Sequence, residues 1–161
     1  MSTPATDLDT QTRIEVLELP GQAALSDFRL AKLLRELQRR DERVKAVAAR
    51  YCYFVAARRP LDREQRERLN ALLLSGEAKA ALGKGIRRLY AVPRPGTISP
   101  WSSKATDIAV ACGLDDVERI ERGICYGLSF RGNVADRDVH ALAEPLYDRM
   151  TETLLDRKAH V

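Results

Sequence analysis

The feature that most constrains the fold is a repeat, because the sequence matches itself when it is shifted by 73 positions. Residues 17–74 then align with residues 90–147 without a gap. The matched pairs are Pro20 and Pro93, Ser26 and Ser99, Phe28 and Trp101, Val44 and Val117, Cys52 and Cys125, Tyr53 and Tyr126, Arg58 and Arg131, Leu69 and Leu142, and Leu73 and Leu146. Identity is low, but local patterns in the same order in both copies are typical of a duplicated unit.

Each copy predicts a strand, a helix, a second strand and a second helix. In the first copy we expect a strand over 13–19, a turn over 20–25, a helix from a Ser26 cap to Arg40, a strand over 44–57, and a helix from about Asp62 to Gly76. In the second we expect a strand over 86–92, a constrained loop over 93–98, a helix from a Ser99 cap to Gly113, a strand over 117–130, and a final helix from Asp136 through Leu154 that Pro145 kinks or breaks. Spacing also assigns five residues to one face of the helix after Ser99: Trp101, Ala105, Ile108, Ala109 and Cys112.

This order predicts an α+β fold, in which two similar halves join into a pseudo-dimeric sheet that helices cover on one face. We expect a loose tail over 1–12 and one domain over 13–155. Within that domain, repeat one spans 13–75, a joint spans 76–85 and repeat two spans 86–150, while 156–161 begins a linker.

Composition argues against several classes of protein. No apolar run approaches the ~20 residues of a membrane span, and the polar, acidic N-terminus is unlike a secretory signal. Three cysteines without a C-x-x-C pattern predict buried thiols in a reducing compartment, and two distant histidines argue against a zinc site. We therefore expect a cytoplasmic protein with no membrane partner.

Nucleic acid is not the expected partner, although the net charge is +4. Acids accompany the arginines of the basic segment, and the pairs Asp62 with Arg66 and Glu64 with Arg68 have the i,i+4 spacing of a solvated helix face. RNA binding through strand tyrosines such as Tyr51, Tyr53 and Tyr126 is a weaker alternative, because covering helices bury at least one sheet face.

The segment 93–104 is the candidate site, since glycine-rich phosphate loops and catalytic triads are absent from the sequence. Its prolines and glycine lead into a helix N-terminus, where unpaired N–H groups and the helix dipole favour an anion. We predict no catalytic residue and no metal site, but a substrate-binding or domain-interface site of Arg94, Gly96, Thr97, Ser99, Trp101, Ser102, Ser103 and Lys104. The simpler alternative is that Ser99-Pro100 only caps the helix and Trp101 only packs in the core.

Two segments carry a resemblance to a known family: PRPGTISPWSSKATDIA over 93–109 and CGLDDVERIERGICY over 112–126. Both resemble the N-terminal domain of the large phosphoribosylformylglycinamidine synthase, also called FGAM synthase or FGAR amidotransferase. The likeness continues through 21–34 and 145–155 and covers about 14 to 155. It implies a fold like a fused dimer of the small subunit found in the multi-subunit form of the enzyme.

The resemblance also implies a function. The family's enzymes are glutamine-dependent ligases of purine biosynthesis, which use ATP to convert formylglycinamide ribonucleotide into formylglycinamidine ribonucleotide. A synthetase domain with ATP and Mg and a glutaminase domain would lie beyond residue 161, so we expect no cofactor in this chain and no activity from it alone.

The partners implied are these two domains, with the phosphate of formylglycinamide ribonucleotide as a further candidate. The chain would help to assemble the enzyme and border the synthetase site. The alternative is a stand-alone module that binds a small anion or a nucleotide.

Overall fold

The computed structural model describes residues 15–74 and 85–156, which form a five-stranded antiparallel sheet with helices and confirm the α+β prediction. The strands, in the sheet order β1-β2-β4-β3-β5, are β1 (Glu15–Ala23), β2 (Val44–Ala57), β4 (Val117–Phe130), β3 (Arg87–Pro93) and β5 (Glu152–Leu155). The helices are α1 (Asp27–Arg40), α2 (Arg63–Leu73), α3 (Pro100–Ala111) and α4 (Asp136–Ala141), followed by a short 3₁₀ turn (Glu144–Leu146).

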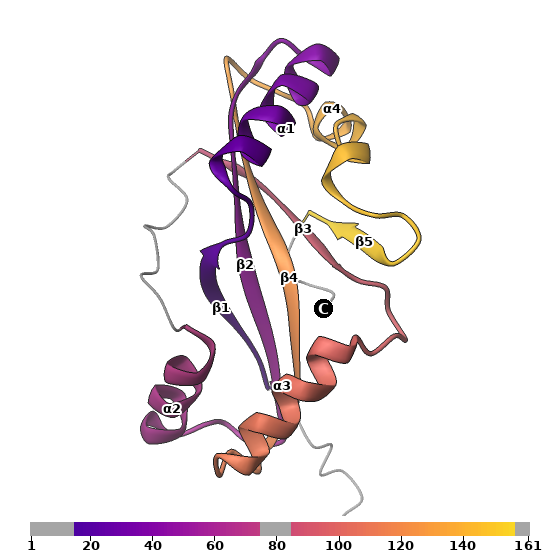
Figure 1. The fold of residues 1–161 in the computed structure, drawn as a ribbon. Helices are drawn as coiled ribbons and strands as arrows, with labels where there is room; N and C mark the ends of the chain where they lie inside the picture. The colour runs from indigo at the N-terminus through magenta and orange to yellow at the C-terminus, as the bar shows by residue number, and fades with distance from the viewer. Residues whose placement is uncertain (1–14, 75–84, 157–161) are drawn as a thin grey trace, which may run out of the picture.

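The long strands β2 and β4 form the centre of the sheet (Figure 1). They pair antiparallel along their whole length, from Val44 opposite Phe130 to Ala57 opposite Val117. Both segments are rich in β-branched and aromatic residues, which favour extended backbone. Their predicted bounds are confirmed to the residue.

All four helices pack on one face of this sheet, in two separate clusters. Leu33 and Leu37 of α1 pack with Val139 of α4 over one end of the central strands. Leu69 of α2 and Ala109 of α3 pack over the other end. A third cluster lies on the opposite face, and in the described ranges only strand residues contribute to it: Cys52, Phe54, Tyr90, Val92, Cys125 and Leu155.

The two halves of the sheet have equivalent hydrogen bonds at the ends of the central strands. The Arg58 N–H donates to the Asp116 carbonyl at 2.9 Å, and the Arg131 N–H donates to the Arg43 carbonyl at 2.7 Å. Each donor and each acceptor differs from its counterpart by the 73 positions of the sequence repeat. The arrangement is compatible with duplication, which stays a prediction.

The gap-free alignment of the two copies is wrong at their first strands. Cys52 lies opposite Pro20, whereas its counterpart Cys125 lies opposite Tyr90, three residues before Pro93. The residue of the second copy that is structurally equivalent to Pro20 is therefore Tyr90 rather than Pro93. The extra length in the second copy falls in the loop between β3 and α3, which is the segment that the sequence singles out.

The predicted helix starts are confirmed. Ser26 and Ser99 cap α1 and α3, and Asp62 caps α2 through a capping box with Gln65. The predicted ion pair between Glu64 and Arg68 also forms, at 2.7 Å. None of the helices in residues 15–74 and 85–156 has the length and apolarity needed to cross a bilayer.

The predicted final helix is wrong beyond Ala141. Pro145, which has no N–H to donate, lies in the 3₁₀ turn, and the chain then returns to the sheet as β5. Leu154 pairs with Ala91 of β3 and is half-buried against the first cluster, so its helical spacing from Leu142 and Leu146 arises from packing in a strand. Tertiary pairing has therefore overridden a helical pattern.

Three smaller predictions also fail or lie outside the described residues. The turn expected over 20–25 is wrong, because β1 continues to Ala23 with an irregularity after Pro20. Ile108 and Cys112 are exposed rather than inward, since α3 crosses the end of the sheet and buries only a narrow face. The tail over 1–12, the stop at Gly76 and nearly all of the joint lie outside the described residues.

Alkaline pH should destabilise the fold through the buried tyrosine and cysteine side chains of the central strands and β3. Burial raises the pKa of Tyr126 to about 12, and it also raises the pKa values of Cys52 and Tyr90. A group with a raised pKa stabilises the folded state fully below its unfolded pKa, here 9.0 for cysteine and 10.0 for tyrosine, and loses that contribution as pH rises toward the folded value. We expect the free energy of unfolding, measured in urea, to fall steadily above pH 9. Tyr126→Phe should make the fall in unfolding free energy above pH 10 less steep. An unchanged pH profile in this variant would contradict the assignment of this part of the fall to Tyr126.

Candidate functional site

The loop between β3 and α3 is held in one shape by a turn. The hydroxyl and the N–H of Thr97 both donate to the Arg94 carbonyl, at 2.6 and 3.1 Å. Gly96 has a φ of +82°, a conformation that glycine adopts readily and other residues rarely. The Arg94 N–H donates to the Thr151 carbonyl at 3.1 Å, which ties the loop to the segment before β5.

A buried carboxylate lies next to the N-terminus of α3. Glu121 of β4 is 6% exposed, and its Oε1 accepts from the Ser99 hydroxyl at 3.0 Å and the Arg122 N–H at 3.1 Å. Arg119 donates from Nη2 to Glu121 Oε2 and to the Thr97 carbonyl, both at 2.8 Å. The chain therefore places an anion of its own beside Ser99, where the sequence argument placed an external one.

The hydroxyls of Ser102 and Thr106 attach α3 to the edge of β4. Ser102 is buried, and its hydroxyl donates to the Ile120 carbonyl at 2.6 Å. The Ile120 N–H in turn donates to the Thr106 hydroxyl at 3.0 Å. Pairing with β3 ends at Ile124, so these side chains satisfy backbone groups that the sheet leaves open.

The structure thus divides the predicted site residues into two groups. Arg94, Thr97, Ser103 and Lys104 are exposed, and Gly96 lies in the exposed turn among them. Ser99 and Ser102 use their hydroxyls inside the protein. We call the exposed group Arg94, Gly96, Thr97, Ser103 and Lys104 the rim.

Trp101 forms a stack with side chains of the central strands. Its ring lies 5.7 Å from the ring of Tyr53 in a stacked geometry, at an interplanar angle of 21°. The Arg122 guanidinium lies over both Trp101 and Tyr51, at 4.7 and 4.6 Å from the ring centroids. Such cation–π contacts fix the first turn of α3 against the middle of the sheet.

Sequence reasoning missed Glu121, Arg119 and Arg122. All three lie in the segment predicted as the strand over 117–130, and no functional role was assigned to it. The sequence signal that could have identified these residues is the presence of charged side chains within a strand that is otherwise apolar. Within the ranges that the structure describes, no group of three or more His, Cys, Asp or Glu side chains is placed to hold a metal ion.

The two serine caps provide a matched test of the Glu121 network. Ser26→Ala removes an exposed cap and should cost about 1 kcal/mol of unfolding free energy. Ser99→Ala removes a cap and also a donor to the buried Glu121 carboxylate, so it should cost about 2–4 kcal/mol. Urea denaturation of both variants measures the difference. Equal losses would show that the Ser99–Glu121 bond contributes nothing.

A model of a known protein family matches most of the chain. The family model described as formylglycinamide ribonucleotide amidotransferase N-terminal matches residues 50–161, which is more than half of the chain. The match contains residues 50–57 of β2, the loop before α3, the Glu121 network, and both Tyr53 and Arg122 of the Trp101 stack. The chain therefore belongs to the family of N-terminal regions of formylglycinamide ribonucleotide amidotransferase, the FGAM synthase of purine biosynthesis.

Proposed function

We propose that the chain is an assembly domain of FGAM synthase that borders the synthetase site. It docks on the synthetase domain, and the glutaminase domain completes the enzyme. ATP, Mg and the reacting groups belong to those domains, and this chain supplies shape and contacts rather than a catalytic side chain. Family membership supports this role. The observation that carries it is that the middle of the helix-bearing face of the sheet is open and mostly uncharged.

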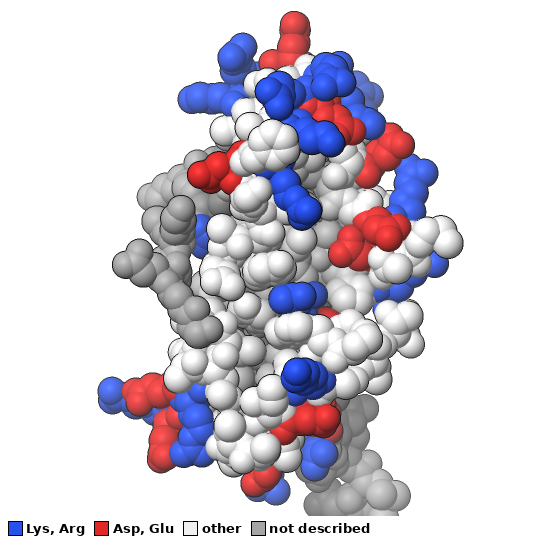
Figure 2. All heavy atoms as spheres, viewed as in Figure 1, with Lys and Arg blue, Asp and Glu red and all other residues white. Residues whose placement is uncertain are grey.

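That middle region is left open by the helices. α1 and α3 both begin near the middle of the sheet and run toward opposite ends (Figure 1). Charged side chains gather over those two ends, whereas the middle of the face is mostly uncharged (Figure 2). We call this region, with Tyr51, Trp101 and Arg122 at its centre, the central face.

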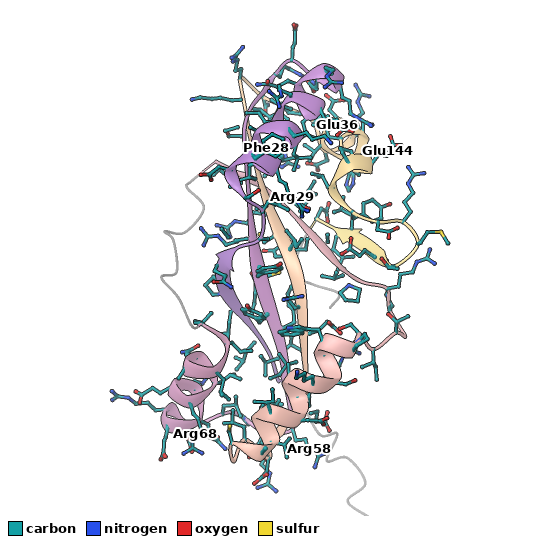
Figure 3. The ribbon with its side chains drawn as sticks, viewed as in Figure 1. Phe28, Arg29, Glu36, Arg58, Arg68 and Glu144 are labelled. Atoms are coloured by element: carbon teal, nitrogen blue, oxygen red, sulfur yellow. The ribbon has the colours of Figure 1, made fainter. Side chains whose placement is uncertain are left out.

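The central face has the composition of a protein interface. Tryptophan, tyrosine and arginine contribute most of the binding energy at the centres of many interfaces. Phe28 is 75% exposed and lies in the first turn of α1 beside Arg29, on the same side of the sheet (Figure 3). Phe28 therefore adds exposed apolar surface on this side of the sheet.

Arg122 indicates what the partner surface carries. Its guanidinium is half-buried against two rings, and no carboxylate in the described ranges pairs with it. Stacked arginines keep their N–H groups free at the edge of the plane, where they bind a carboxylate in a bidentate manner. We therefore expect an aspartate or glutamate of the synthetase domain to bind Arg122.

The rim lies beside the central face, on the loop and first turn of α3. Arg94 and Lys104 offer charge, and Ser103 offers a hydroxyl, to the substrate phosphate or to the synthetase domain, while the Thr97 hydroxyl holds the turn through the Arg94 carbonyl. Gly96 shapes the turn, and Trp101, Ser99 and Ser102 hold the helix that presents these groups.

Loss of the rim should slow the complete enzyme without unfolding the domain. Lys104→Ala combined with Ser103→Ala removes a charge-assisted contact of about 1.5–3 kcal/mol, so kcat/KM for formylglycinamide ribonucleotide should fall about tenfold or more. Steady-state kinetics of the full-length synthase measures this, with Lys32→Ala and Arg39→Ala on the exposed side of α1 as the matched control. Unchanged kinetics would mean that the loop only caps α3.

The central face is tested separately through Arg122→Met, which removes the charge but keeps an unbranched apolar stem. The thermal unfolding midpoint of the full-length synthase should drop, because the partner's carboxylate is left buried without a cation. The isolated chain should show a much smaller change, since the described residues give Arg122 ring contacts but no ion pair. Equal shifts in both proteins would place the role of Arg122 within this domain.

A further inference from the structure

The face of the sheet opposite the helices contains a pocket beside the loop of the candidate site. Its volume is about 330 Å³. Val16, Phe54, Val92 and Leu155 supply apolar walls from four different strands, and residues 93–95 close one side. We call this cavity the rear pocket.

Two arginines give the rear pocket a polar end. Arg119 lines it, and the Nε–H of this side chain is buried without an acceptor in the part of the chain that the structure describes. A buried donor without an acceptor is unfavourable, because no bond replaces its lost hydration. Arg94 also lines the pocket, is exposed, and has no side-chain partner in the same ranges.

The charges at this end do not cancel. Glu121 is the acid among the lining residues that the structure describes, and its two oxygens already accept from Ser99, Arg119 and the Arg122 N–H. Arg119 balances that carboxylate, so the charge of Arg94 remains. Among the described lining residues, the pocket is mainly apolar and has one cation in excess, which suits a small molecule with an apolar body and a single anionic group.

We propose that the rear pocket binds a small aliphatic or aromatic monocarboxylic acid. Its apolar body packs against Phe54, Val92 and Leu155, and its carboxylate is received by Arg94, with the Arg119 guanidinium beside it. Inorganic phosphate fits less well, because apolar walls cannot replace its hydration. An apolar molecule without an acid group gives the Arg94 charge no counter-ion.

An occupant of the rear pocket also acts on the candidate site. Arg119 holds the Thr97 carbonyl, and Glu121 holds the Ser99 hydroxyl, so a ligand on Arg119 contacts the network that shapes the loop. Trp101, two residues after Ser99, is the only tryptophan of the chain. Its fluorescence therefore reports on this network without interference.

Octanoate is the probe, with 1-octanol and inorganic phosphate as comparisons. In calorimetry on the chain, octanoate should bind saturably with a stoichiometry of one, and Trp101 fluorescence should change over the same concentration range. Octanol should bind more weakly and phosphate should not bind. Arg94→Ala should weaken octanoate binding about tenfold, as expected for one lost charge-assisted contact, while Arg39→Ala, an exposed cation on α1, should change nothing.

Ala56→Leu provides a second test, because Ala56 lines the rear pocket and a larger side chain there fills it. This variant should lose octanoate binding but keep the Trp101 spectrum of the free protein. The proposal is overturned if octanoate fails to bind, if octanol binds as tightly as octanoate, or if Arg94→Ala and Arg39→Ala behave alike. These assays read ligand binding by the chain alone, so their failure is distinct from a failure of the assembly role.

Discussion

The pairing of β2 with β4 is the constraint on which the rest of the structure depends. Both helical clusters rest on one face of this ladder, one toward each end. The strands are long enough to separate the helices, which is why Trp101, Tyr51 and Arg122 meet in an open region. The central face is thus a consequence of strand length.

Local chemistry in the sequence was sufficient to predict most elements. Ser26, Asp62 and Ser99 mark helix starts because a side-chain oxygen accepts from a backbone N–H at a fixed distance along the chain. β5 was not predictable in this way, since Leu154 has helical spacing from Leu142 and Leu146 and only its pairing with Ala91 makes it a strand. Patterns of spacing record burial, and they do not show what buries the residue.

The candidate site was predictable in position but only partly in composition. Proline, glycine and serine over 93–99 locate a constrained loop and a helix start, and the structure has both. Which hydroxyls stay free depends on partners far along the chain: Ser99 meets Glu121 and Ser102 meets Ile120. No local rule contains that information, because these contacts arise when α3 crosses the edge of β4.

The hydroxyl contacts at Ile120 have a consequence for self-association. An open strand edge offers N–H and C=O groups to any other extended chain and is a common origin of aggregation. Where β4 runs past its neighbour β3, Ser102 and Thr106 already engage the groups of Ile120. The helix that presents the rim therefore also shields β4, one of the two longest strands, from pairing with a foreign strand, and the same serine and threonine serve solubility as well as architecture.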